Sequence, residues 1–354
     1  MLTAMQPRVV TATARDRRSA RRRGLAIATL VLALSLVLAA CGKGDGGSGD
    51  KPDSQPIAGG TELAALWPLT GEPVTGATPD RPVMVVKIDN SSSSQPQLGL
   101  KKADLVTEEL VEGGITRLAV FYYQHLPGVV GPVRSMRATD IGVVKPAHGV
   151  IVASGAAVPT LRRLDRAKVP YYTEGGPGYF REGSRSAPYN LMVELPKTAK
   201  AAKKKAVVPA SYLPWGSESD FAGGQPAKSI DAVFSRSHTT SWRYRSGNYV
   251  NDNSNAAEGD RFKPDSVLVL RVRQGDAGYL DPAGNPVPET LYFGSGPALL
   301  FHKGEVVRGT WTKKSRRAPV RLSTKAGPLK VPAGNVWIEL VPTANAGGSV
   351  RFGK

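Results

Sequence analysis

The sequence has little of several chemistry-bearing residues. It contains one cysteine and four histidines among its 354 residues, and aromatic side chains make up only 7%. A single thiol excludes an intramolecular disulfide, thiol catalysis and cysteine-based metal sites. The histidines, at positions 125, 148, 238 and 302, show no metal-ligand spacing. A glycine-rich phosphate loop, a Gly-x-Ser-x-Gly elbow and a Ser-x-x-Lys motif are also missing. The sequence therefore predicts no metal site and no cofactor, and it does not name a reaction.

Acidic residues are few beside basic ones. The chain has 29 Asp and Glu against 47 Lys and Arg, a formal charge of +18. Residues 1–40 hold seven arginines and one acid, so the charge without this segment is +12. Such an excess favours anionic partners such as lipid headgroups, wall polymers or nucleic acid. The alternative is a solvated basic surface in a chain that uses arginine freely.

The first 40 residues have the pattern of an export signal. Basic residues 15–23 precede an apolar run, 25–40, that is shorter than the roughly 20 residues a membrane-spanning helix needs. The run ends in Leu-Ala-Ala-Cys-Gly, which resembles a bacterial lipobox, where the cysteine is diacylated and becomes the new N-terminus. The sequence thus predicts a lipoprotein signal peptide over residues 1–40, lipidation of Cys41 and an anchor on the extracytoplasmic face of the membrane. A buried cysteine in a secreted protein, or an uncleaved anchor, is the alternative. An export signal also argues against a nucleic-acid partner.

The rest of the chain divides by composition. Residues 41–65 are rich in Gly, Ser, Asp and Pro, which predicts a flexible tether. A loop-like stretch at 209–228 separates region 66–208 from region 229–345, and domains of roughly 100 to 200 residues are usual. We therefore expect an α/β (α+β) N-terminal domain with a mixed sheet, followed by a smaller, mostly-β C-terminal domain.

Polar residues follow an apolar strand early in the first domain. Residues 81–90 are typical of a buried strand that delivers Asp89 and Asn90 into a serine-rich loop. Ligands bind at such strand ends in open α/β sheets, although Asx residues before serines commonly only turn the chain. The next segment is a strand or a helix, and in both forms Glu108 and Glu112 would share a face. These carboxylates could hold a divalent cation, pair with arginines or form a solvated edge.

Three arginines flank a predicted hairpin. Residues 118–123 and 129–133 have the pattern of two strands joined by a Pro-Gly turn. Such a hairpin would bring Arg117 near Arg134 and Arg137. Clustered arginines are costly inside a protein unless they are paired, so a phosphate or carboxylate ligand is one candidate partner. The internal candidates are Glu108, Glu112 and Asp140.

The second region carries strand signals. Residues 266–272 and 334–342 are apolar runs, and residues 299–311 predict a hairpin around Lys303 and Gly304. Before it, lysine-rich residues 197–205 predict a helix whose basic side would suit an anionic surface or simply be solvated.

Short motifs occur in a fixed order along the chain. They are Pro-Leu-Thr-Gly at 68–71, Ala-Asp-Leu-Val at 103–106, Val-Glu-Gly-Gly-Ile-Thr-Arg at 111–117, Gly-Pro-Val-Arg-Ser-Met-Arg at 131–137, Arg-Ser-Ala-Pro-Tyr-Asn-Leu at 185–191, and segments 309–315 and 332–337. Together they resemble the YerB-like lipoproteins, the family that carries the DUF3048 domains. One departure is Tyr189, which stands where the family usually has His. The resemblance covers about residues 66–345 and implies a two-domain extracytoplasmic lipoprotein, but no reaction.

Two function classes remain. The first is a lipoprotein that binds an anionic envelope ligand or a protein partner without catalysis. The second is an Mg-dependent enzyme acting on a phosphorylated lipid or cell-wall polymer, by loose analogy to the LytR-CpsA-Psr phosphotransferases, of which no full motif is present. The enzyme needs its arginines in one open pocket, and arginines paired with carboxylates under a covered surface would contradict it. The candidate ligand-binding residues are Asp89, Asn90, Glu108, Glu112, Arg117, Arg134, Arg137, Arg185 and Asn190.

Overall fold

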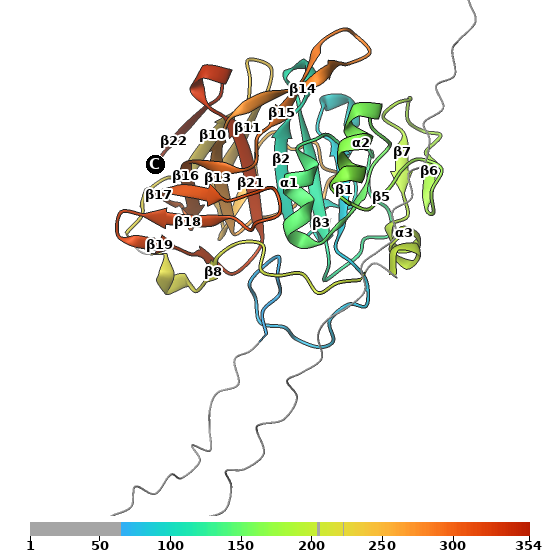
Figure 1. The fold of residues 1–354 in the computed structure, drawn as a ribbon. Coiled ribbons are helices and arrows are strands. Elements are labelled where there is room, and N and C mark those ends of the chain that lie inside the picture. Colours follow the sequence, from blue (N-terminus) through green and yellow to red (C-terminus); the bar gives the residue numbers. More distant parts are fainter. Residues whose placement is uncertain (1–64, 204–205, 222) are drawn as a thin grey trace, which may run out of the picture. The chain divides into compact units, whose positions relative to one another are not determined.

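One large mixed sheet organises the molecule (Figure 1). The computed structural model describes residues 65–203, 206–221 and 223–354. From the first region the sheet takes β1 (Met84–Asp89), β2 (Leu105–Leu110), β3 (Thr116–Tyr122), β4 (Val150–Val152) and β5 (Tyr171–Tyr172). From the second it takes β9 (Gln225–Pro226), β13 (Ser266–Val272), β16 (Gly294–His302), β17 (Glu305–Lys313), β18 (Arg321–Thr324), β19 (Gly327–Leu329) and β21 (Val336–Pro342).

The two regions join in the middle of this sheet. The strand order is β19-β18-β17-β16-β13-β21-β2-β3-β1-β4-β5, with β9 beside β17. Strand β21 is parallel to both β13 and β2, whereas β3 is antiparallel to β2 and to β1. All seven residues of β21 are buried, as expected of a strand covered on both faces. The described residues therefore form one compact unit rather than two separable halves.

The remaining elements cover the two faces and edges of the sheet. The helices are α1 (Asp140–Val144), α2 (Val158–Arg166) and α3 (Leu195–Ala202), with 3-10 turns η1 (Ser92–Ser94), η2 (Leu100–Lys102), η3 (Glu112–Gly114), η4 (Lys145–Ala147), η6 (Glu218–Asp220) and η7 (Ala344–Ala346). A second sheet contains β10 (Ser229–Val233), β11 (Thr239–Arg245), β12 (Asn248–Asn251) and β22 (Ser349–Gly353). Short pairs are β6 (Tyr179–Arg181) with β7 (Leu191–Val193), β8 (Trp215–Gly216) with β20 (Val331–Pro332), and β14 (Gln274–Leu280) with β15 (Pro286–Thr290).

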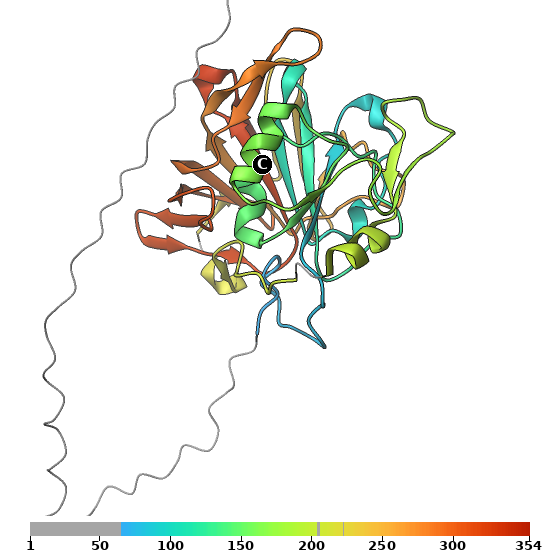
Figure 2. The ribbon, with the colours of Figure 1, turned by 45° about the vertical axis from the view of Figure 1, so that its right-hand side comes forward.

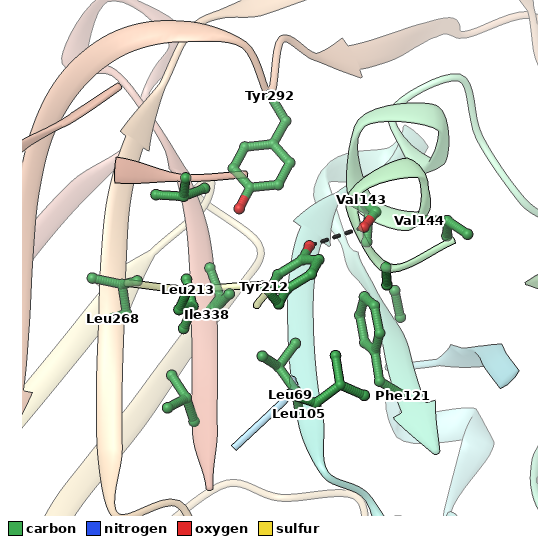
Figure 3. Close-up of a cluster of buried hydrophobic side chains, with 14 of the residues drawn as sticks. Leu69, Leu105, Phe121, Val143, Val144, Tyr212, Leu213, Leu268, Tyr292 and Ile338 are labelled. Carbon is green, nitrogen blue, oxygen red and sulfur yellow. Dashed lines mark hydrogen bonds between the residues drawn. The ribbon is translucent and has the colours of Figure 1, made fainter. Parts of the chain in front are cut away.

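Two hydrophobic cores fill the space on either side of the large sheet. On one face, side chains of the sheet pack under α1 and α2, which Figure 2 shows stacked along the sheet. Here Tyr212 packs on Phe121 and donates a hydrogen bond of 2.9 Å to the carbonyl of Val143 (Figure 3). On the other face, α3 and the four-stranded sheet cover a second core, where Trp242 and Trp337 meet edge to face at 5.0 Å. Burying each such aromatic side chain contributes about 2–3 kcal/mol to folding.

Several predicted elements are confirmed. The strand at 266–272 is β13, the hairpin around Lys303 and Gly304 is β16 with β17, and part of the lysine-rich segment forms α3. The regular elements that the described residues form from 229 onward are strands and one 3-10 turn, so the predicted fold class agrees with the structure. The boundaries between domains stay predictions, because the sheet crosses both regions.

The hairpin predicted from residues 118–123 and 129–133 is wrong. Both edges of β3 are occupied, by β1 and by β2, and residues 129–133 make only single bridges to other segments. Pro132 lacks the backbone N–H that a strand ladder needs at this point. The true hairpin partner of β3 is β2. Its turn contains Gly113 and Gly114 at φ of 73° and 72°, a left-handed conformation that glycine adopts without strain.

The predicted signal peptide, Cys41 and nearly all of the tether lie outside the described residues. Within the described ranges, the helices are all too short or too polar to cross a membrane.

Candidate functional site

Charged side chains occupy both faces of the sheet at the end where β1 stops and β2 turns into β3. Successive residues of a strand point to opposite faces. Arg117 of β3 stands opposite Asp89 of β1 and Glu109 of β2, so these side chains share the face covered by α1. We call the charged group on this face the ionic network. Its members are Lys87, Asp89, Glu109, Glu112, Arg117, Arg134, Arg137 and Asp140, four bases and four acids.

Lys87 lies at the buried centre of the ionic network. Its Nζ is 2.6 Å from Oε1 of Glu109 and 2.8 Å from Oδ1 of Asp140, and all three side chains are at most 1% exposed. Burial disfavours the ammonium, but the two carboxylates outweigh this, and the pKa of Lys87 is raised. Burial, together with the charge of Asp140, raises the pKa of Glu109 to about 7. The structure thus holds this trio by mutual pairing, and losing one member would leave an uncompensated charge.

Glu112 joins two of the predicted arginines. Its carboxylate accepts a hydrogen bond of 2.9 Å from Nε of Arg137 and pairs also with Nη2 of the same side chain, while Nη2 of Arg117 lies 3.0 Å from Oε1. Arg117 also donates to the carbonyl of Ser135 at 3.0 Å. Burial opposes the charge on Glu112, yet the hydrogen bond from Arg137 and the charges of both arginines lower its pKa to about 2. Burial and the charge of Arg137 lower the pKa of Arg117 to about 10.

Arg134 is the most accessible base of the ionic network. Its Nε donates to Oδ2 of Asp89 at 2.8 Å, and 21% of its side chain is exposed against 1% for Asp89. The guanidinium lies 5.2 Å from the ring centroid of Tyr189, a cation–π contact. Asp89 also accepts the backbone N–H of Ser91 at 2.8 Å, so it turns the chain as well as pairing. Among the described residues, the terminal nitrogens of Arg134 donate no hydrogen bond.

Glu108 and Asn90 lie on the opposite face. Glu108 accepts hydrogen bonds from Thr116 at 2.6 Å, Thr240 at 2.9 Å and Asn90 at 3.0 Å, and its Oε1 is 2.9 Å from Nε2 of His238. The prediction that Glu108 shares a face with Glu112 is therefore wrong. The physical reason is that β2 ends at Leu110, and Glu112 already belongs to the η3 turn, where strand alternation no longer applies.

A second buried carboxyl faces Glu108. Strand pairing sets Glu339 of β21 directly beside Glu108, both fully buried, and Trp242 donates to Glu339 at 2.7 Å. Burial and the charge of Glu108 raise the pKa of Glu339 well above its ordinary value. Against the effect of burial, hydrogen bonding and charge from His238 lower the pKa of Glu108. Two buried carboxyls whose pKa values are shifted in opposite directions thus meet where the two sequence regions join.

Arg185 and Asn190 stabilise a surface loop and are not part of the ionic network. Arg185 donates to the carbonyl of Pro96 at 2.7 Å, and Asn190 accepts from Arg181 at 2.6 Å. Only Tyr189 of this loop reaches the network, through Arg134.

Sequence reasoning missed four members of these clusters. They are Lys87, Glu109, His238 and Glu339. Three of them interrupt apolar strands, as in Met-Val-Val-Lys-Ile-Asp and Val-Trp-Ile-Glu-Leu-Val-Pro. A charge inside a strand buried on both faces needs a partner, and that signal could have been used.

Comparison with known proteins gives the family. A family model described as "Protein of unknown function (DUF3048) N-terminal domain" matches residues 69–208, and the corresponding C-terminal domain model matches residues 230–338. "Putative lipoprotein YerB" of Bacillus subtilis (strain 168) is 25% identical over 295 residues, 79% of this chain and 87% of that protein. A crystal structure of YerB from Bacillus subtilis superimposes with a TM-score of 0.67 at 22% identity, covering 82% of this chain and all of that one.

Fold and site define a mixed-sheet protein whose two regions share one sheet and enclose a balanced network of buried charges. The chain belongs to the DUF3048 family, and the resemblance expected from its motifs is confirmed. The description of the family assigns no function.

Proposed function

We propose that this chain is a lipid-anchored protein on the extracytoplasmic face of the bacterial membrane, where it binds an anionic envelope ligand or an acidic group of a protein partner without catalysis. The lipobox-like sequence at Cys41 and the description of the relative as a putative lipoprotein support the anchor. Arg134 supports the binding, because its guanidinium is partly exposed and only its Nε is paired, with Asp89, among the described residues. This is the observation on which the proposal depends.

Arg134 is held on several sides, yet its terminal nitrogens donate no hydrogen bond to a described residue. Its backbone N–H binds the carbonyl of Lys87 at 2.8 Å, and its carbonyl accepts from Ser154 at 3.0 Å. Asp89 holds Nε, and the ring of Tyr189 packs against the guanidinium. The terminal nitrogens of Arg134 therefore remain available as a planar fork, the geometry that matches phosphate and carboxylate oxygens. A preorganised side chain loses little entropy when a ligand binds.

The other two arginines are poor ligand groups. Arg117 and Arg137 are 4% and 10% exposed, and both are paired with Glu112. A ligand would have to displace this carboxylate from its two partners. Their role is to hold the turn of η3 against the loop that carries Arg134.

The enzyme hypothesis gains no support from this arrangement. It required Arg117, Arg134 and Arg137 to converge with acidic residues in an open pocket. They do converge, but on carboxylates of the chain itself, and Glu108 lies on the opposite face. The binding proposal needs none of these pairs to open.

Calorimetric titration with glycerol 3-phosphate tests the proposal on the chain from residue 61 onward, which holds the compact unit. We expect Arg134→Gln to weaken binding at least tenfold, because charge-assisted hydrogen bonds contribute about 1.5–3 kcal/mol. Arg134→Lys should bind at an intermediate level, since it keeps the charge and loses the fork. Binding should not depend on Mg²⁺.

Arg236→Gln is the matched control, because Arg236 is exposed and its side chain forms no hydrogen bond or ion pair with a described residue. Equal affinities of Arg134→Gln and Arg236→Gln would contradict the proposal. Binding of glycerol 3-phosphate seen only with Mg²⁺ would instead support the enzyme hypothesis.

A further inference from the structure

A second cationic site lies on the same face of the sheet, beside α1. It is a cavity of about 420 Å³ between α1, the end of α2 and the loop that follows β17. Four basic side chains line it, together with apolar groups and a serine. We call it the basic pocket and define it by Lys145, Lys314, Arg316 and Arg317.

A buried lysine holds the loop that carries three of these bases. Lys313 is 1% exposed, and its Nζ donates to the carbonyls of Ser315 at 3.1 Å, Arg316 at 2.9 Å and Ala318 at 2.5 Å. Burial, then the charge of Arg316, lowers the pKa of Lys313 to about 7. The buried lysine therefore fixes the loop as a curved segment, and its neighbours Lys314 and Arg317 are exposed.

The charges of the basic pocket are not balanced by acids. No carboxylate lines the cavity. Glu289 reaches one of its bases, Arg316, at 3.0 Å, and shares the same oxygen with Arg163 at 2.6 Å. Within the described part of the chain, the side chain of Lys145 donates only to the carbonyl of Lys168, at 3.2 Å. The side chains of Lys314 and Arg317 have no hydrogen-bond or ion-pair partner among the described residues.

Like charges held together at a concave surface create a positive potential that favours an anion. Burial, followed by the charges of Arg317 and Lys168, lowers the pKa of Lys145. The environment of Lys145 thus disfavours the positive charge on its own ammonium group. An anion with several oxygens would relieve this repulsion and could accept from the arginine forks and lysine ammonium groups at once.

One wall of the pocket is apolar. Phe293 and Ile141 line it, and the guanidinium of Arg316 lies 4.4 Å from the ring centroid of Phe293. Cations beside an apolar wall suit a ligand that has a charged group attached to an apolar portion. The pocket therefore differs from the neighbourhood of Arg134, where the base is paired with Asp89 and packs on Tyr189.

We propose that the basic pocket is a binding site for a phosphate-bearing anion of charge −2 or greater, such as a diphosphate group. Arg316 and Arg317 supply the forks, and Lys145 and Lys314 supply point charges. The same chemistry is offered by a soluble diphosphate and by the headgroup of an anionic lipid. This site is independent of the proposed function of Arg134, because the two use different residues.

Titration with inorganic pyrophosphate and flotation with vesicles that contain cardiolipin, whose headgroup carries two phosphates, test the proposal and separate these sources. The protein is the chain from residue 61 onward with Arg134→Gln, so that the proposed site at Arg134 does not contribute to binding of the probes. We expect Lys314→Ala with Arg317→Ala to weaken binding at least tenfold. The matched control is Lys102→Ala with Arg236→Ala, which removes the same charge from two other exposed positions and should bind like the Arg134→Gln chain.

Binding of pyrophosphate that is lost in the pocket variant supports a soluble or terminal diphosphate. Binding only to the vesicles, again lost in the pocket variant alone, supports a lipid headgroup. Equal loss in both double variants would show a nonspecific charge effect and overturn the proposal. It is also overturned if the Arg134→Gln chain binds neither probe. Because this chain lacks the proposed site at Arg134, failure of one site does not imply failure of the other.

Discussion

The ionic network and the basic pocket each gather four cationic side chains, but they differ in what surrounds the charges. The network matches its four bases with four carboxylates and covers most of them. The pocket has no carboxylate in its lining, and two of its bases are exposed and unpaired among the described residues. A cluster of basic residues in a sequence therefore does not by itself identify an anion site. What decides is whether the fold supplies internal acids, because a buried base needs a partner and an exposed one does not.

Two lysines allow the sharpest test of this difference. Lys87→Met should lower the free energy of unfolding by about 3–5 kcal/mol, because Glu109 and Asp140 would be left buried without their shared cation. The same substitution at exposed Lys314 should change it by less than about 0.5 kcal/mol. Urea denaturation at neutral pH measures both values. A loss below about 1 kcal/mol for Lys87→Met would show that the network is not structural.

Glu112→Gln tests the arginine part of the network. We expect a loss of about 2 kcal/mol, because the carboxylate holds both Arg117 and Arg137 through charge-assisted hydrogen bonds. The sign of the pH dependence follows from the pKa of Glu112, about 2 in the folded protein against an ordinary value of 4.5. Its contribution is complete above pH 4.5 and is lost as the pH falls from there through 2.

Stability measured across this acid range should therefore fall less steeply in Glu112→Gln than in the original chain. Glu174→Gln is the control, because Glu174 forms an ion pair with Arg181 in which both side chains are more than 40% exposed. Exposed pairs contribute at most about 1 kcal/mol. Similar losses for the two variants would contradict the structural role of Glu112.

The smallest effect on stability is expected for substitutions in the basic pocket. Lys314→Ala with Arg317→Ala should leave the unfolding free energy within about 0.5 kcal/mol of the original value while removing anion binding. A thermal-denaturation scan without added anion checks this, and a clear destabilisation would mean that the bases hold the loop.

Local features of the fold could be predicted from the sequence. Strand β13 and the β16–β17 hairpin follow from clear strand patterns, and the contact of Arg117 with Glu112 joins residues only five positions apart. The gathering of Arg117 with Arg134 and Arg137 was expected for the wrong reason, since β3 pairs with β1 and β2. An extended segment such as 129–133 has the same composition as a strand. It cannot pair with β3, because β1 and β2 already occupy both edges of that strand.

Long-range features could not be predicted in this way. The contact of β2 with β21 joins residues more than 200 positions apart, so the sequence around Glu108 does not indicate that Glu339 is its neighbour. The basic pocket combines α1, the end of α2, Phe293 and the loop after β17. The loop after β17 already shows a run of basic residues, Lys-Lys-Ser-Arg-Arg at 313–317, but Lys145 and Phe293 join it only when the chain folds.

The most direct test of the central claim is a crystal structure of the chain from residue 61 onward grown with selenate, read from the anomalous signal of selenium. The account predicts selenate in the basic pocket between Lys314 and Arg317 and at the terminal nitrogens of Arg134, with Glu112 still paired to Arg117 and Arg137. Selenate bound to Arg117 in place of Glu112, with the basic pocket empty, would contradict it.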